Sequence, residues 1–501
     1  MKIASNSLEN SLSNATLPSK HDISNSSNVI NHDNAIASEV KGSSIQKSVI
    51  WDISTVLSTI FTFSDFKDLI KFNTVCKKWN IVTNPTIHRS LKLFRRNDIQ
   101  NIAHGESLNK NARVDAEVEQ CIANNSKFSC LVKEFKFCNF IPQHRTEQFF
   151  NTFKFITSLT ILNIGLSYES FISVIKPLAQ LEELKLENIG IKTDDGGESN
   201  AEPHALPYTL TRLKLNIISL TGNVDLFAQT INSHINLKEF RYLTYDRTGF
   251  LEPFNKSYPS LKLLEFDSHR LESDQILLKV IENNNGLNSI KFKLPYISDS
   301  ILDNINTHLT SLEELSLSTY SDHSVDISES LFKFNQPTSI KKLILRWEYL
   351  SSTSLDSILL NCPCLKDIEL QLTDDWKNWI DILHSRCLNL QKITYIPWIN
   401  YYGKERNRFN QEFYNYTFSN NTSQIGNTLV DLTLANFNFN IAKSSYFKDF
   451  AKLKSLTFTT PYNFNCCEWN NKLNSEIWSD YRLKEYKCSS TVLIKLEKFE
   501  I

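Results

Sequence analysis

The stretch Leu312-Glu-Glu-Leu315-Ser-Leu317 decides the fold, because the same six-residue phrase recurs along most of the chain. The phrase is one apolar residue, two variable residues, one apolar residue, one variable residue and one apolar residue. Leu181-Glu-Glu-Leu184-Lys-Leu186 is another clear copy. Fourteen copies begin at residues 132, 159, 181, 210, 237, 261, 287, 312, 340, 365, 390, 429, 453 and 483. Most copies are therefore 22 to 30 residues apart.

A period of this length, with one short alternating strand in each unit, is typical of a leucine-rich-repeat solenoid. We therefore predict an α/β solenoid over residues 128–501, with parallel strands inside and helices outside. Stripes of apolar residues predict helices over 273–282 and 298–309. Breaker residues predict an inserted loop at 190–207, and one long spacing predicts a second insertion at 397–428.

One position departs from the usual repeat. The ninth residue of the phrase is commonly Asn or Cys, whose side chain satisfies backbone groups in the following turn. Here it is never Asn, and the first six copies read Phe140, Ser167, Ile189, Ile218, Tyr245 and His269. The turns must therefore satisfy their backbone groups in other ways.

Composition excludes several functional classes. The formal net charge is −1, from 54 basic and 55 acidic residues, so no broad field attracts nucleic acid or an anionic membrane. Only 11 glycines are present, and neither nucleotide-binding glycine motif occurs. No apolar run approaches the roughly 18 residues of a membrane span, and the N-terminus lacks a signal-peptide core. We expect an intracellular protein, cytoplasmic or nuclear, that binds neither membrane nor nucleic acid.

The sequence offers no converging set of catalytic or metal-binding groups. None of the ten cysteines forms a CxxC pair with a matching second pair, and the histidines are scattered. Cys362, Cys387 and His234 each stand three residues before a repeat phrase, a position that predicts burial. Trp376 and Trp379 lie on an apolar helical stripe that predicts core. We therefore expect a non-enzymatic protein without a cofactor.

The residues that precede the predicted solenoid, 1–127, have three parts. Residues 1–48 contain twelve Ser, seven Asn and no aromatic residue, which predicts disorder. Residues 49–91 predict three short helices, the first capped by Ser54, the second beginning at Ser64 and Asp65, and the third ending near Asn84-Pro85. About forty residues cannot bury so many large apolar side chains alone, so another protein or the solenoid should cover some of them. Residues 92–127 predict a linker with one helix.

Part of the helical region resembles an F-box. The resemblance rests on Val56-Leu-Ser-Thr-Ile60-Phe61, Asp68-Leu69, Val75-Cys76-Lys77-Lys78-Trp79 and Ile87-His88. The family often opens with Leu-Pro, where this sequence has Asp52-Ile53. In addition, the stretch from Leu359 through Cys362-Pro363 to Leu370 looks like the repeat phrase of F-box/leucine-rich-repeat proteins. The two resemblances occur in the family's order and together cover most of the chain.

The resemblance implies a substrate-recognition subunit of a Skp–cullin–F-box ubiquitin ligase, in which the F-box docks on a Skp-type adaptor and, through it, on a cullin. Carried over by position, the docking residues are Val56, Leu57, Ile60, Phe61, Leu69, Val75, Cys76 and Trp79. Two alternatives stay open. These residues could instead form a private helical cap on the first repeat, and the chain could be a leucine-rich-repeat scaffold that acts without ubiquitin.

Strand alternation predicts where a protein substrate binds. Positions three, five and seven of each phrase point away from the core and should line the inner face with a mixed polar surface. The predicted substrate-binding residues are Lys342, Arg346, Asp367, Glu369, Trp398, Tyr401 and Tyr402. The last three belong to the aromatic insertion at 397–428. That insertion could instead pack on the outer side of the solenoid.

Overall fold

The structure is a computed structural model that describes residues 53–93, 107–138, 141–193, 203–232, 234–245, 256–271, 273–320, 332–397, 403–419, 424–461, 478, 480–488 and 491–499. The predicted disordered segment 1–48 lies outside these ranges, as do residues 194–202 of the predicted loop. Trp398, Tyr401 and Tyr402 also lie outside them, so their assignment to substrate binding stays a prediction.

The described strands form one sixteen-stranded sheet in the order β1 to β14, then β16, then β15. Neighbouring strands from β1 to β14 are parallel, whereas β16 and β15 are antiparallel to their neighbours. The strands are β1 (Ser90–Leu93), β2 (Glu134–Phe137), β3 (Ser158–Ser167), β4 (Glu183–Lys192), β5 (Arg212–Thr221), β6 (Glu239–Thr244), β7 (Leu263–Ser268), β8 (Ser289–Leu294), β9 (Glu314–Thr319), β10 (Lys342–Arg346), β11 (Asp367–Leu372), β12 (Lys392–Pro397), β13 (Asp431–Ala435), β14 (Ser455–Pro461), β15 (Tyr481–Cys488) and β16 (Thr491–Lys498).

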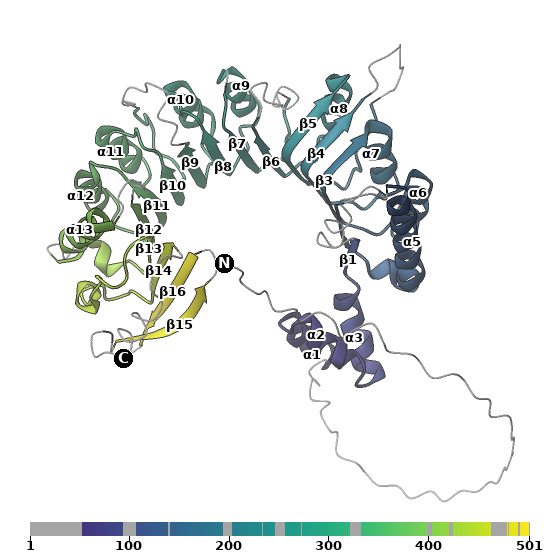
Figure 1. Ribbon diagram of the computed structural model, residues 1–501. Coiled ribbons are helices and arrows are strands. Elements are labelled where there is room, and N and C mark those ends of the chain that lie inside the picture. The colour runs from purple at the N-terminus through teal and green to yellow at the C-terminus, as the bar shows by residue number, and fades with distance from the viewer. Residues whose placement is uncertain are drawn as a thin grey trace, which may run out of the picture. The chain divides into compact units, whose positions relative to one another are not determined.

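Helices connect most of the parallel strands and lie along one side of the sheet (Figure 1). The α-helices are α1 (Ile53–Thr62), α2 (Phe66–Asn73), α3 (Lys77–Ile87), α5 (Ser107–Asn125), α6 (Gln143–Thr152), α7 (Tyr168–Ile175), α8 (Val224–Asn232), α9 (Gln275–Asn283), α10 (Asp299–His308), α11 (Ser352–Leu360), α12 (Trp376–Arg386) and α13 (Gly403–Tyr414). Short helical turns are η1 (Ser126–Leu131), η3 (Asn415–Ser419, a π-helix), η4 (Gln424–Asn427) and η5 (Ser444–Phe447).

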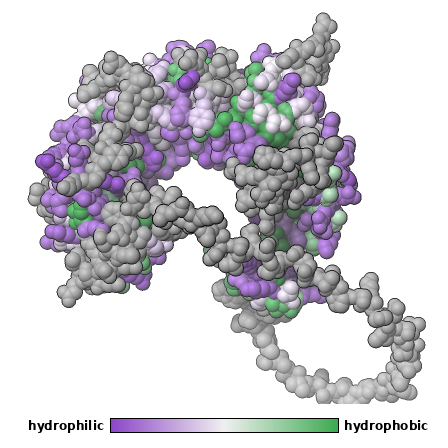
Figure 2. Space-filling model, viewed as in Figure 1, coloured by the Kyte–Doolittle hydropathy of each residue, from purple (hydrophilic) through white to green (hydrophobic). Residues whose placement is uncertain are grey.

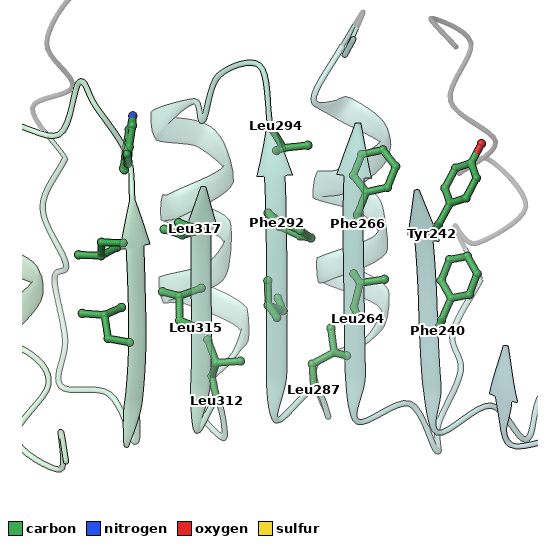
Figure 3. Packing of buried hydrophobic residues seen from close by; sticks show 14 of the residues in the cluster. Phe240, Tyr242, Leu264, Phe266, Leu287, Phe292, Leu294, Leu312, Leu315 and Leu317 are labelled. Atoms are coloured by element: carbon green, nitrogen blue, oxygen red, sulfur yellow. The ribbon is translucent and has the colours of Figure 1, made fainter. Parts of the chain in front are cut away.

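The apolar positions of the phrase build one continuous core between the sheet and its helices. Tyr242, Phe266, Phe292 and Leu317 are paired in register on β6 to β9, and all four are buried. Figure 3 shows these side chains at matching heights on neighbouring strands. Parallel strands stacked in chain order, each followed by a helix or loop that covers the same side, form a leucine-rich-repeat solenoid. The predicted α/β solenoid is confirmed.

Thirteen of the fourteen phrases become parallel strands, and the fourteenth does not. The phrase that begins at Leu483 lies in β15, which pairs antiparallel with β16 rather than joining the parallel stack. Conversely, β1 is a parallel strand that the phrase missed. It pairs with β2 through Leu91 and Leu93, while His88 stands where the phrase requires its first apolar residue. His88 stacks on Phe128 with 3.7 Å between ring centroids.

Several predicted boundaries need correction. The loop predicted from residue 190 begins later, because β4 continues to Lys192 and pairs with the equally long β5. Ser54 is not the N-cap of the first helix, because α1 already includes Ile53. α3 does not end at Asn84, but continues through Pro85 to Ile87. The second helix was predicted to begin at Ser64 and Asp65, but α2 begins at Phe66; Asp65 is its N-cap and accepts a hydrogen bond from the Asp68 amide at 2.8 Å.

The predicted packing residues are buried. Cys362, Cys387 and His234 lie in the core, and burial raises the pKa of the Cys362 thiol to about 11. Trp376 and Trp379 on α12 are buried as well. Among the helices that the structure describes, none is long and apolar enough to cross a membrane.

Candidate interaction surfaces

The three N-terminal helices are held together by a small aromatic core. Phe61 of α1 lies 5.3 Å from the rings of both Phe72 on α2 and Trp79 on α3, and Phe72 lies 5.5 Å from Trp79. Leu69 is buried in the same module. The three-ring contact fixes the angles between helices that are each too short to be stable alone. We call residues 57–88 the three-helix module.

A polar network joins α2 to α3. Asn73 donates to the Asn84 side chain at 3.2 Å, Asn84 donates to Asn80 at 2.9 Å, and Asn80 donates back to Asn73. The buried Thr83 hydroxyl donates to the Trp79 carbonyl at 2.8 Å. Because each amide is satisfied by another, the network orients the two helices without leaving a buried polar group unpaired. In the sequence, only the spacing of four residues between Asn80 and Asn84 hints at this network.

For its length, the module exposes more large apolar side chains than the rest of the described chain. Six of the sixteen large apolar side chains that are exposed among the described residues lie in the module. Phe63 is 87% exposed, Val75 61% and Ile70 47%; Ile60, Phe66 and Ile81 complete the set. Figure 2 shows hydrophobic residues at the surface of these helices. Monomeric proteins rarely leave such clusters in water, so the module is a candidate docking surface.

The structure divides the residues that the F-box resemblance assigns to docking. Val56, Ile60, Val75 and Cys76 are exposed, whereas Leu57 and Trp79 are partly buried. Phe61 and Leu69 are almost completely buried and belong to the module's core. The last two residues can support a docking surface from beneath but cannot reach a partner in this conformation.

The other candidate surface is the side of the sheet that the helices leave uncovered, formed by positions three, five and seven of each phrase. We call it the open face. Its charged residues pair within strands and across neighbouring strands: Lys185 and Arg212 with Glu183, Lys214 with Glu187, Arg241 with Glu239 and Glu265, and Lys291 and Lys342 with Glu314. The predicted mixed polar surface is therefore present, but much of its charge is neutralised internally.

The four described residues predicted to bind substrate all lie in this ladder of ion pairs. Lys342 pairs with Glu314 at 2.9 Å, Arg346 pairs with Glu369, and Asp367 pairs with Lys392 at 3.3 Å. Glu314 receives hydrogen bonds from three side chains. Burial alone would raise its pKa, but hydrogen bonds from Lys342, Ser289 and Lys291 lower it to about 2. These pairs connect strands, so binding through them would first have to break them.

The aromatic insertion contributes mostly to the core. α13 buries Phe409, Phe413 and Tyr414, and Phe418 follows on η3. The ring of Phe413 lies 5.5 Å from Trp376, 5.3 Å from Tyr395 and 4.8 Å from Phe437. α13 thus takes the place of the repeat helix between β12 and β13. The described part of the insertion is core, which was the alternative to substrate binding.

Neither surface carries metal chemistry within the described ranges, where no three His, Cys, Asp or Glu side chains are placed to hold a metal ion. The two candidate surfaces consist of apolar side chains on the module and of paired charges on the open face.

No protein-family model matches the chain, and no curated protein matches its sequence. Among solved structures, it is similar to a chain of the Toll–Spatzle complex from Drosophila, with 14% identity and a TM-score of 0.30 over 69% of this chain and 42% of that one. It is also similar to a chain of the TLR13–ssRNA13 complex, with 11% identity and a TM-score of 0.31 over 78% of this chain and 62% of that one. This chain spans less than two thirds of either. At these values neither likeness says what the protein binds, and the solenoid is identified from its own strands.

Proposed function

We propose that this chain is the substrate-recognition subunit of a Skp–cullin–F-box ubiquitin ligase. The three-helix module binds a Skp-type adaptor and, through it, a cullin, while the solenoid holds the protein to be ubiquitinated. The chain is not itself an enzyme in this role. It acts inside the cell, in the cytoplasm or nucleus, by bringing the substrate close to the catalytic subunits.

The observation that carries the proposal is the exposed apolar surface on a module whose sequence resembles an F-box. Its small aromatic core already uses Phe61, Phe72 and Trp79, so the exposed side chains are not needed to hold the helices together. Leaving Phe63, Ile70 and Val75 in water costs stability that docking would recover, at roughly 25 cal/mol for each Å² covered. A protein partner with an apolar groove satisfies this requirement.

The test replaces exposed residues rather than core residues. We expect Ile70→Asp combined with Val75→Asp to abolish adaptor binding, since losing one interface anchor costs about 2 kcal/mol, or about thirtyfold in affinity. The thermal unfolding temperature should not change, because both side chains are exposed. The measurement is recovery of adaptor and cullin with the purified full-length protein.

The matched control is Ile235→Asp, which makes the same change at an exposed isoleucine of the solenoid. This variant should retain the adaptor. Leu69→Ala and Trp79→Ala are less informative, because both residues support the module and their loss would unfold it. If the wild-type protein recovers a partner through its solenoid but no adaptor or cullin, the rival function, a scaffold independent of ubiquitin, replaces this one.

A further inference from the structure

Beside the ion pairs of the open face lies a stack of side chains that the proposed function does not use. Tyr245 and His269 have ring centroids 4.8 Å apart, and His269 stacks on Tyr320 at 3.7 Å. The Lys293 ammonium lies 4.0 Å above the Tyr320 ring, and the Tyr320 hydroxyl donates to the Asp267 carboxylate. We call Tyr245, His269, Tyr320 and Lys293 the aromatic stack.

The stack arises from the unusual ninth position of the repeat phrase. Tyr245, His269 and Tyr320 are the ninth residues of the phrases that begin at 237, 261 and 312, and each directly follows its strand, β6, β7 or β9. β7 and β9 are not neighbours, because β8 lies between them and supplies Lys293. Four consecutive strands thus present one rigid group of side chains at the same end of the sheet.

The stack remains accessible. Tyr245 is 51% exposed, His269 and Lys293 are exposed, and Tyr320 is partly buried. Exposed rings contribute little to the core. Tyrosine is, however, among the residues that most often anchor protein interfaces, because it buries a large rigid ring and retains a polar group.

The polar groups of the stack select the charge of a partner. The Lys293 ammonium already lies over one face of the Tyr320 ring. It therefore blocks that face to a cation of a partner and repels such a cation. Asp267, the nearby acceptor, is engaged by the Tyr320 hydroxyl. The stack therefore presents donors, namely the ammonium of Lys293, the imidazole of His269 and the hydroxyl of Tyr245.

The charged residues around the stack also favour an anionic partner. Arg270 follows His269 and is exposed, and among the described residues neither Arg270 nor Lys293 has an ion-pair partner. The cations next along the sheet differ in this respect, since Arg241 and Lys291 are both paired with glutamates. The end of β7 and β8 is thus a place where positive charge is available to an incoming group.

We propose that the aromatic stack anchors a partner protein by an anionic side chain, a carboxylate or a phosphate, packed beside the exposed rings. Charge-assisted hydrogen bonds from Lys293 and Arg270 hold the anion, and the rings of Tyr245 and His269 cover its apolar flank. This inference rests on the proposed function, in which the solenoid binds the substrate. It adds that the substrate is recognised through an anionic side chain.

The test measures binding of labelled short peptides to the full-length protein by fluorescence anisotropy. Three peptides share one Gly, Ser and Leu framework and carry glutamates, phosphoserines or lysines. We expect the glutamate or the phosphoserine peptide to bind, the tighter of the two identifying the source of the anion, and the lysine peptide not to bind. Lys293→Ala and Tyr245→Ala should each weaken the binding about tenfold.

Lys238→Ala is the matched control, because it removes an exposed lysine just before β6, roughly 20 Å along the strand from Tyr245 at about 3.3 Å per residue. An equal loss with this variant, or no binding by either anionic peptide, would overturn the proposal. The Ile70→Asp, Val75→Asp protein should bind the peptides normally. This double variant separates the two proposals, because it can lose adaptor binding while it still binds the peptides. Conversely, Lys293→Ala can lose peptide binding while it still binds the adaptor.

Discussion

Three adjacent strands contain one left-handed residue each, and the third of these residues is strained. Asn163 on β3 has a φ of 51°, Asn188 on β4 has 54°, and Ile217 on β5 has 54°. The residues on either side of them pair in register across the three strands. Asn188 donates a side-chain hydrogen bond to Asn163 at 2.9 Å. Asparagine tolerates the left-handed region, but a β-branched isoleucine there is an outlier.

We expect Ile217→Asn to stabilise the protein by about 1 kcal/mol. Relief of the left-handed strain contributes roughly 1–2 kcal/mol, and a hydrogen bond to Asn188 adds about 0.5–1 kcal/mol by extending the pair that Asn188 forms with Asn163. Against this, the partly buried Ile217 loses about 1 kcal/mol of apolar burial. The loss is small because Ile217 is not among the partly buried side chains that pack on the core, unlike its neighbour Leu220.

The assay is equilibrium unfolding in urea, in which the midpoint should rise while the slope stays constant. The reciprocal variant Asn188→Ile is the internal check. It places a β-branched residue at a φ of 54° and removes the bond to Asn163, so the midpoint should fall by the equivalent of about 2 kcal/mol. An unchanged or lower midpoint for Ile217→Asn, together with an unchanged midpoint for Asn188→Ile, would refute the reasoning.

Two further predictions concern the open face and the insertion. Glu314→Gln should lower the unfolding temperature most at neutral pH. The pKa of Glu314 is about 2 in the fold against 4.5 ordinarily, so its stabilisation is complete above about pH 4.5 and is lost as the pH falls toward 2; an effect independent of pH would contradict this. Phe413→Ala should cost about 3–5 kcal/mol because the ring is completely buried, while Arg408→Ala on the exposed side of α13 should cost little; equal, small effects in thermal unfolding would show that the insertion is not core.

The solenoid could be predicted because its core repeats. The fourth and sixth residues of each phrase lie on one face of a short strand, the first apolar residue is buried just before that strand, and neighbouring copies reinforce one another. The helices over 273–282 and 298–309 were predicted within a few residues of α9 and α10, where Ser298 caps α10 by accepting from the Ile301 amide. Periodicity carries this information even without the usual asparagine.

The two ends of the sheet could not be predicted in the same way. A terminal strand has a neighbour on one side only, so its sequence is free to depart from the phrase, as His88 does before β1. At the other end, Leu483 keeps the phrase but lies in the edge strand β15, which carries exposed Arg482 and Lys484, both paired with Glu497 of β16. Charged side chains and the register shift between Leu483 and Glu485 protect such an edge from pairing with another chain.

The same limit governs the candidate sites. Apolar spacing on a short helix shows that a residue avoids water, but not whether its own chain or a partner covers it. Ile60 and Phe61 are adjacent in the segment that resembles an F-box. Phe61 is nevertheless buried against Trp79, whereas Ile60 is exposed. The ion pair between Lys342 and Glu314 could not be predicted from the sequence either, because the two residues belong to different repeats. The motif therefore predicts where the short helices lie, whereas only the packing separates the residues that support their surface from those that are exposed on it. For that reason variants of Ile70 and Val75 test docking, and variants of Leu69 and Trp79 test folding.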